Sequence, residues 1–103
     1  MTKGEIFENS DNIKAILQTH KVQKAYFFGS ICTDKFTTQS DVDFLIDFGI
    51  GLDPIEYGEL YFSLLYTLQD YIKREVDLVT EPSLKNPYFI KSINATKKVI
   101  YEQ

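Results

Sequence analysis

Residues 27–46 read FFGSICTDKFTTQSDVDFLI and carry the clearest structural signals in the chain. They begin inside an apolar segment, residues 24–28, whose aromatic composition and closing Gly29 predict a short β-strand. Ser30 follows, and ten residues separate it from a strictly alternating segment, residues 41–48, which predicts a second strand. A Gly-Ser turn between two strands is therefore the predicted centre of the fold.

Strict alternation assigns the side chains of the second strand to two faces. Residues two apart on a strand point to the same side and lie roughly 6–7 Å apart. Asp41 and Asp43 are therefore expected to project together from one face of the sheet. That face comprises Asp41, Asp43, Leu45 and Asp47, and the opposite face comprises Val42, Phe44, Ile46 and Phe48.

Helices are predicted on both sides of this stretch. Ser10 and Asp11 favour a helix start, and apolar residues then recur at helical spacing up to His20. Residues 53–56 combine a capping aspartate, a proline suited to the first turn and a capping-box-like glutamate. Helical spacing then continues for about five turns. A shorter helix is expected to open at the Gly-Ser turn itself.

Two further elements complete the predicted order. Residues 75–80 alternate and predict a third strand, and Asn86-Pro87 predicts the start of a last helix. The buried side of that helix is marked by Ile90, Ile93 and Ile100. The order α-β-α-β-α-β-α predicts a small sheet with helices packed on it, an α/β domain that spans residues 1–103.

Composition and charge restrict the function classes. The 103 residues include 11 basic and 15 acidic side chains, and no basic run exceeds two residues, so direct nucleic-acid binding is not expected. An acidic chain with 15% aromatic residues is better suited to a basic protein partner. The single cysteine excludes an internal disulfide. Neither a signal peptide nor a membrane span is recognised, so a cytoplasmic protein is expected.

Three aspartates are the candidate functional residues. If the third strand lies beside the second, Asp77 joins Asp41 and Asp43 on one side of the sheet. Clustered carboxylates repel one another unless a cation lies between them, and Mg²⁺ favours carboxylates together with phosphate oxygens. The turn at Gly29 and Ser30 adds backbone amides and a hydroxyl that suit phosphate. The combination indicates metal-dependent chemistry at phosphorus.

Each of these features has an ordinary structural interpretation when it is taken alone. Aspartates at strand ends are most often solvated or cap a turn, and a Gly-Ser pair mostly marks a simple turn. The ordered combination of apolar strand, Gly-Ser, Asp-x-Asp and a further strand aspartate favours the functional interpretation.

The same residues resemble the signature of a known family. Phe27-Phe28-Gly29-Ser30, the ten-residue gap and Ser40-Asp41-Val42-Asp43-Phe44-Leu45-Ile46 are similar to the motif of minimal nucleotidyltransferases of the DNA polymerase beta superfamily. The nearest likeness is to MntA-type antitoxins, which are encoded beside HEPN-domain toxins. The resemblance extends over nearly the whole chain and implies a polymerase-beta palm-like fold with a mixed sheet.

The resemblance also implies roles for individual residues. Asp41 and Asp43 match the metal-binding pair, Gly29 and Ser30 match the triphosphate-holding turn, and Asp77 matches the third carboxylate of the metal and catalytic set. The implied cofactor is Mg²⁺, as two ions, and the implied substrate is ATP. The implied reaction is transfer of AMP to a tyrosine of a HEPN toxin, within a hetero-oligomer of the two proteins.

One departure from the family pattern affects the phosphate site. Related antitoxins often carry Ala-Arg-Gly beyond the Gly-Ser turn, whereas this chain has Cys32-Thr33-Asp34. Lys35 is the candidate replacement cation, although it lacks the forked geometry of arginine. Two alternatives therefore stay open: an antitoxin that neutralises its toxin by binding alone, and a small-molecule nucleotidyltransferase subunit.

Several other residues have side chains that could take part in chemistry or binding. His20 is expected to be a solvated residue at a helix end, and Cys32 a partly buried residue near the turn and not a nucleophile. Asp47 is expected to end its strand. The tyrosines of the long helix are expected to pack in the core or to form part of a toxin-docking surface, and they are Tyr57, Tyr61, Tyr66 and Tyr71.

Overall fold

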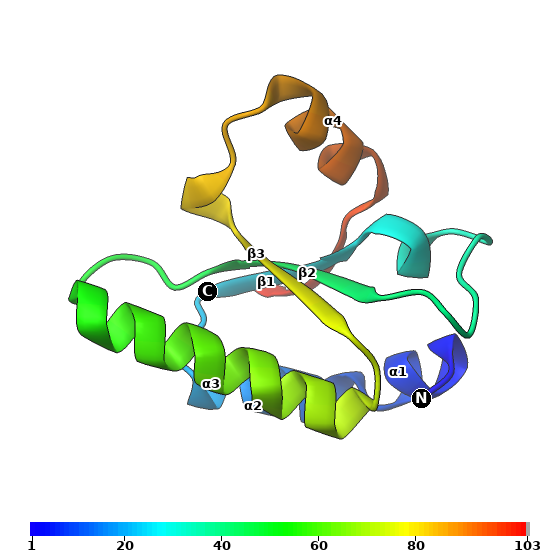
Figure 1. The fold of residues 1–103 in the computed structure, drawn as a ribbon, viewed down its shortest axis with the longest axis horizontal. Coiled ribbons are helices and arrows are strands. Elements are labelled where there is room, and N and C mark those ends of the chain that lie inside the picture. Colours follow the sequence, from blue (N-terminus) through cyan, green and yellow to red (C-terminus); the bar gives the residue numbers. More distant parts are fainter. Residues whose placement is uncertain (103) are drawn as a thin grey trace.

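The computed structural model describes residues 1–102, which form a four-stranded sheet with helices on both faces (Figure 1). The helices are α1 (Lys3–Glu8), α2 (Ser10–Thr19), α3 (Pro54–Ile72) and α4 (Pro87–Thr96), with short 3-10 helices η1 (Gly29–Cys32) and η2 (Glu81–Ser83). The strands are β1 (Lys24–Phe28), β2 (Val42–Asp47), β3 (Val76–Thr80) and β4 (Lys98–Glu102). The predicted α/β class with a small mixed sheet is confirmed.

The sheet has the strand order β3-β2-β1-β4 and contains both kinds of pairing. Strand β1 runs antiparallel to β2 and to β4, whereas β2 and β3 are parallel and are connected through α3. The two central strands, β1 and β2, are therefore the ones that the Gly-Ser turn and the following loop connect.

Each face of the sheet has its own layer of apolar side chains. Val42, Phe44 and Ile46 of β2 belong to the larger core, which α1, α2 and α3 cover. Leu45 faces the other way and packs with Ile93 of α4. The predicted two faces of β2 are thus confirmed. Figure 1 shows α4 alone on one side of the sheet and the other three α-helices on the opposite side.

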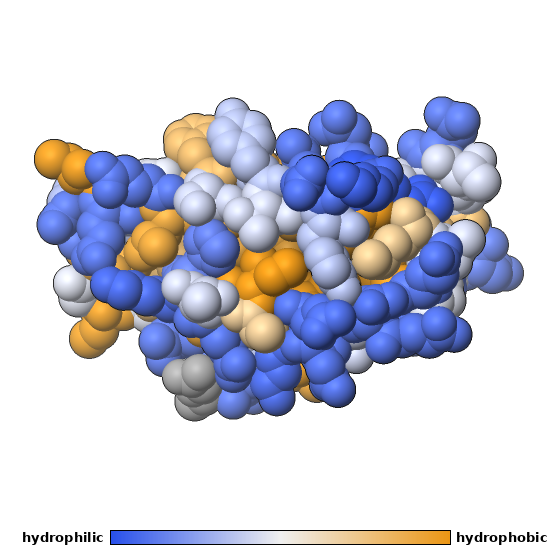
Figure 2. All heavy atoms as spheres, turned by 90° about the horizontal axis from the view of Figure 1, so that it is seen from below, coloured by the Kyte–Doolittle hydropathy of each residue, from blue (hydrophilic) through white to orange (hydrophobic). Residues whose placement is uncertain are grey.

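The outer surface of the three-helix layer is largely hydrophilic. Figure 2 shows this side from below, with a limited hydrophobic area near its centre and further hydrophobic side chains at one end. The large apolar side chains exposed at the start and middle of α3 include Ile55, Phe62 and Tyr66. Within residues 1–102, no helix combines the length and the apolar character needed to cross a bilayer.

The predicted starts of α2, α3 and α4 are present, but only α3 and α4 have the side-chain caps, because no side chain caps α2. The Asp53 carboxylate accepts hydrogen bonds from the amides of Ile55 and Glu56, and Asn86 caps α4 in the same way. Glu56 does not complete a capping box, because its carboxylate forms an ion pair with Lys21 at 2.7 Å. The ion pair ties the start of α3 to the end of α2.

Two parts of the predicted element order are wrong. The chain begins with an unpredicted helix, α1, which Thr2 and Glu5 start with a capping box. The last helix ends at Thr96, and the residues from Lys98 onward form β4 instead of continuing the helix. Ile100 therefore lies on an edge strand and not on a helix face. The observed order ends in a strand, and the sheet has four strands where three were predicted.

Candidate functional site

Two aspartates stand side by side on neighbouring parallel strands. In the β2–β3 register, Asp43 is directly opposite Asp77. Both residues point to the α4 side of the sheet, because their neighbours Val42, Phe44 and Val76 belong to the core on the opposite side. The strand register therefore brings these two carboxylates together, as the sequence predicted.

Asp41 is the third member of the cluster and immediately precedes β2. Burial is the main cause that raises the pKa of the Asp43 carboxyl, to about 6, and the nearby charges of Asp77 and Asp41 raise it further. The ordinary value for this group is 3.8. The three negative side chains form a region of concentrated negative charge, with Asp41 and Asp77 exposed and Asp43 half-buried.

The Gly-Ser turn lies against this cluster. Phe28, the last residue of β1, is paired with Asp43, so the chain turns at Gly29 immediately beside the carboxylate. Gly29 has a left-handed backbone, with φ of 77°, and a Cβ at this position would collide with the Asp43 carboxylate. The carboxyl carbon of Asp43 is only 3.2 Å from where that Cβ would stand. Only glycine meets both requirements without strain.

The end of α4 and the residue that follows η1 hold the turn in place. The Gly29 amide donates a hydrogen bond of 3.0 Å to the Thr96 hydroxyl at the end of α4. After the turn, the Thr33 amide and hydroxyl both donate to the Ser30 carbonyl at 2.9 Å. These contacts close η1 into a short helical turn, as the sequence predicted, in which Ser30 is half-buried.

Arg74 anchors the loop that leads from η1 to the first aspartate. Its guanidinium donates to the carbonyls of Thr37 and Ser40 at 2.9 and 2.7 Å, and to the Met1 carbonyl at 2.7 Å. It also lies 4.4 Å from the centre of the Phe36 ring. The only arginine of the chain therefore fixes the backbone immediately before Asp41, a role that sequence reasoning missed.

The predicted cation Lys35 is exposed on this loop, and its amide donates a hydrogen bond to the Thr33 hydroxyl. Lys3 of α1 approaches instead: its ammonium donates to the Thr33 carbonyl at 2.6 Å. Cys32 is half-buried, and burial raises the pKa of its thiol, which disfavours the thiolate. Cys32 therefore has a structural role and is not a nucleophile, as the sequence predicted.

The other candidate residues, His20, Asp47 and the tyrosines of α3, mostly contact residues within the domain. His20 is half-buried, and its ring nitrogens contact the Ile16 carbonyl at 2.7 Å and the Ser63 hydroxyl at 3.1 Å, so it links α2 to α3. Asp47 accepts a hydrogen bond from the Gly49 amide, as expected of a strand-end residue. Of the tyrosines of α3, Tyr57, Tyr61 and Tyr71 pack or form hydrogen bonds within the domain. Tyr66 is exposed.

The donor set fits a divalent cation that shares its coordination with phosphate. In the described part of the chain, no three acidic, histidine or cysteine side chains already lie in metal-binding proximity. Mg²⁺ is commonly held by one or two carboxylates, with substrate oxygens and waters completing its shell. Such a cation would also offset the repulsion that Asp77 and Asp41 exert on the Asp43 carboxylate.

Comparisons with known proteins identify the family of this chain. Residues 11–103 match the family described as Polymerase beta, Nucleotidyltransferase. A candidate protein adenylyltransferase of Methanocaldococcus jannaschii is 38% identical over 80 residues, which are 78% of this chain and 78% of the relative. A second candidate protein adenylyltransferase of that organism is 36% identical over 93 residues, which are 89% of this chain and 91% of the relative.

Solved structures share the fold. A chain in the crystal structure of a toxin–antitoxin with AMP-PNP superposes with a TM-score of 0.73 at 24% identity, over 92% of this chain and 74% of that one. A chain in the structure of a tri-AMPylated Shewanella oneidensis HEPN toxin with its MNT antitoxin gives a TM-score of 0.66 at 23% identity, over 92% and 71% of the two chains. A candidate minimal nucleotidyltransferase gives 0.71 at 19% identity, over 95% of each chain. From the family match and the relatives together, this chain belongs to the polymerase beta nucleotidyltransferase family.

Proposed function

We propose that this protein is a Mg²⁺-dependent protein adenylyltransferase, an antitoxin that transfers AMP from ATP to a tyrosine of a HEPN toxin. The observation that carries the proposal is the direct pairing of Asp43 with Asp77 beside the left-handed turn at Gly29. That arrangement places acidic side chains next to a backbone turn, as the binding of a metal and a triphosphate requires.

The carboxylates would hold the metal, and the turn would hold the triphosphate. Asp41, Asp43 and Asp77 would bind Mg²⁺, which when present supplies positive charge opposite the phosphate oxygens, with two ions in the common arrangement. Gly29 lets the phosphates approach the backbone, and the Ser30 hydroxyl adds a hydrogen-bond donor. Lys35, exposed on the following loop, would act as a mobile cation toward the phosphates.

The transfer step follows from these positions. The acceptor hydroxyl oxygen forms a bond to the α-phosphorus while the bond from that phosphorus to the bridging oxygen breaks, and pyrophosphate leaves. Asp77, which is exposed, accepts the proton of the hydroxyl. Asp43 is half-buried beside Gly29, so it would bind the metal next to the triphosphate and would not contact the acceptor.

The identity of the acceptor is supported by the relatives and not by this chain's own residues. Two similar proteins are named as candidate protein adenylyltransferases, and chains of the same fold occur in complexes with HEPN toxins, one of them AMPylated. We therefore propose a HEPN toxin as partner, a hetero-oligomer with it, a cytoplasmic location and a single domain over residues 1–103.

The test is transfer of label from α-labelled ATP to the HEPN protein encoded next to this chain. Mg²⁺-dependent labelling of the toxin is expected for the native chain, and Asp41→Asn is expected to abolish it with the fold retained. Asp47→Asn is the matched control, because Asp47 lies on the same strand as Asp43 but caps a turn at the far end. Labelling that persists in Asp41→Asn rejects the proposed reaction.

The replacement of Ala-Arg-Gly by Cys32-Thr33-Asp34 favours one alternative, an antitoxin that acts by binding alone. The double variant Asp41→Asn, Asp43→Asn separates the two functions. If cells that express the toxin survive equally well with this variant, neutralisation depends on binding; if protection is lost, it depends on transfer.

A further inference from the structure

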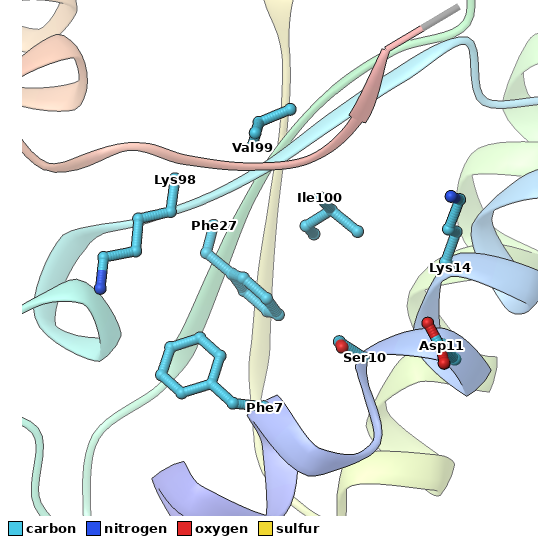
Figure 3. Close-up of a pocket in the computed structure, with 8 residues that line it drawn as sticks. All are labelled: Phe7, Ser10, Asp11, Lys14, Phe27, Lys98, Val99 and Ile100. Carbon is cyan, nitrogen blue, oxygen red and sulfur yellow. The ribbon is translucent and has the colours of Figure 1, made fainter.

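A hollow of about 350 Å³ lies between the N-terminal helices and the edge strand β4 (Figure 3). This volume falls within the range of small-molecule sites in proteins. It is lined by Phe7, Ser10, Asp11, Lys14, Phe27, Lys98, Val99 and Ile100.

The hollow and the candidate nucleotide site are on opposite faces of the sheet. Phe27 lines the hollow and belongs to the core under α1 and α2, whereas Phe28 and the paired Asp43 face α4. Phe7 and Ser10 also precede residue 11, where the match to the nucleotidyltransferase family begins. The hollow is therefore a separate feature of this chain and not an extension of the nucleotide site.

The interior of the hollow is aromatic and aliphatic. The rings of Phe7 and Phe27 meet edge to face with their centres 5.5 Å apart, and Ile100 lies beside them in Figure 3. Phe7 and Ile100 are only partly buried, so their surfaces remain available to a ligand. A flat apolar group that packs against these side chains would remove its own surface and theirs from water, which favours binding.

Two lysines border the hollow from different elements. The Lys98 ammonium of β4 lies 5.6 Å from the centre of the Phe7 ring, and the Lys14 ammonium of α2 lies 5.9 Å from that of Tyr101. Within residues 1–102, neither lysine takes part in an ion pair. Both are therefore available to an anionic group, in a chain whose overall charge is −4.

We propose that this hollow binds a small amphipathic anion, with an aromatic or aliphatic body on Phe7, Phe27 and Ile100. Its acidic group, a carboxylate or sulfonate, pairs with Lys14 or Lys98. Asp11 also lines the hollow and repels additional negative charge. The ligand class is thus a singly charged organic acid and not a nucleoside triphosphate. The inference does not depend on the proposed transferase activity.

The test uses 8-anilinonaphthalene-1-sulfonate, a fluorescent aromatic sulfonate, with the full chain. The native protein is expected to bind one molecule, and the double variant Lys14→Gln, Lys98→Gln is expected to bind at least tenfold more weakly with an unchanged thermal midpoint. The matched control is Lys85→Gln, Lys91→Gln, which removes the same charge from exposed positions outside the hollow. Its affinity is expected to equal that of the native protein.

A neutral analogue isolates the charge contribution. N-phenyl-1-naphthylamine lacks the sulfonate, so its binding is expected to change less than twofold in the Lys14→Gln, Lys98→Gln variant and to fall at least tenfold in Phe7→Ala. Saturation with Mg²⁺ and AMP-PNP is expected to leave both probes bound. Equal weakening of the sulfonate by both lysine pairs, several equivalent sites, or displacement by AMP-PNP would each overturn the proposal.

Discussion

The backbone of Gly29 and the carboxylate of Asp43 are in such close approach that no side chain fits between them. Gly29 follows β1 and begins η1, and Asp43 is the β2 residue paired with its neighbour Phe28. The turn and the acidic cluster are therefore one structural unit. A substitution at either residue is expected to displace the other.

Replacement of Gly29 by alanine tests this contact. The left-handed backbone costs about 1–2 kcal/mol for a residue with a Cβ. The new methyl group also forces the Asp43 carboxylate out of its place. We expect a loss of stability of that size in chemical denaturation, and a fall of at least tenfold in Mg²⁺-dependent nucleotide transfer.

Gly51→Ala is the matched control for that prediction. Gly51 also has a positive φ, of 101°, but no atom lies within 4 Å of its added Cβ. It should show a similar loss of stability with transfer unchanged. If the two variants lose the same amount of activity, the close approach at Asp43 is not what the reaction depends on.

The raised pKa of Asp43 predicts a pH dependence of stability in metal-free buffer. The carboxyl takes up its proton at about pH 6 when folded, against an ordinary value of 3.8. Between these values the folded chain binds more protons than the unfolded chain, so its stability falls as pH rises from about 4 to 6 and stays lower above that. Because the group is half-buried and partly screened by solvent, we expect an effect of about 1–2 kcal/mol.

Asp43→Asn should remove this dependence and make the metal-free protein more stable than the native chain at pH 7. Urea denaturation at pH 4.5 and pH 7 measures both quantities. Added Mg²⁺ is expected to stabilise the native chain and not the variant. A variant less stable than the native chain at pH 7 would show that the carboxylate is not destabilising there.

Arg74 is expected to act through the position of Asp41. Arg74→Lys keeps the charge but loses the fork that reaches the carbonyls of Thr37 and Ser40, at an expected cost of about 2 kcal/mol. If the loop is displaced, the Mg²⁺ concentration for half-maximal transfer should rise several-fold, which a purely structural loss would not cause. Lys73→Gln is the control, since its exposed contact with Asp70 contributes little.

Gly58 offers a stabilising substitution away from the site. It lies within α3, and an added Cβ would meet no atom within 4 Å. Gly58→Ala is therefore expected to stabilise the chain by about 0.5–1 kcal/mol, because alanine loses less backbone freedom in a helix. Thermal denaturation measures the gain, and transfer activity should be unchanged.

The sequence was most informative where periodicity and local chemistry agreed. The alternation of residues 41–48 assigned both faces of β2 correctly, and the caps at Asp53 and Asn86 located the starts of α3 and α4. The convergence of Asp43 with Asp77 followed from placing β3 next to β2. These features depend on neighbouring residues or on a single strand pairing.

The features that were missed depend on distant partners. Ile100 is seven residues from Ile93, which suits a helix face, yet β4 forms through hydrogen bonds to β1, with a register shift near Ala25. Arg74 binds backbone carbonyls, which leave no pattern in the sequence. The helix α1 did carry a signal, the Thr2–Glu5 capping box, but it is only six residues long.

The parallel register of Asp43 and Asp77 has a consequence for insertions and deletions. Lys73 ends α3 in a left-handed conformation, and only two residues separate it from β3. Loss of one residue there would exchange the two faces of β3. Asp77 would then point into the apolar core, and Leu78 would take its place opposite Asp43. A change of two residues would restore the apolar face of β3 but would place Val79 or Glu75 opposite Asp43, so the pairing of Asp43 with Asp77 requires this junction to keep its length.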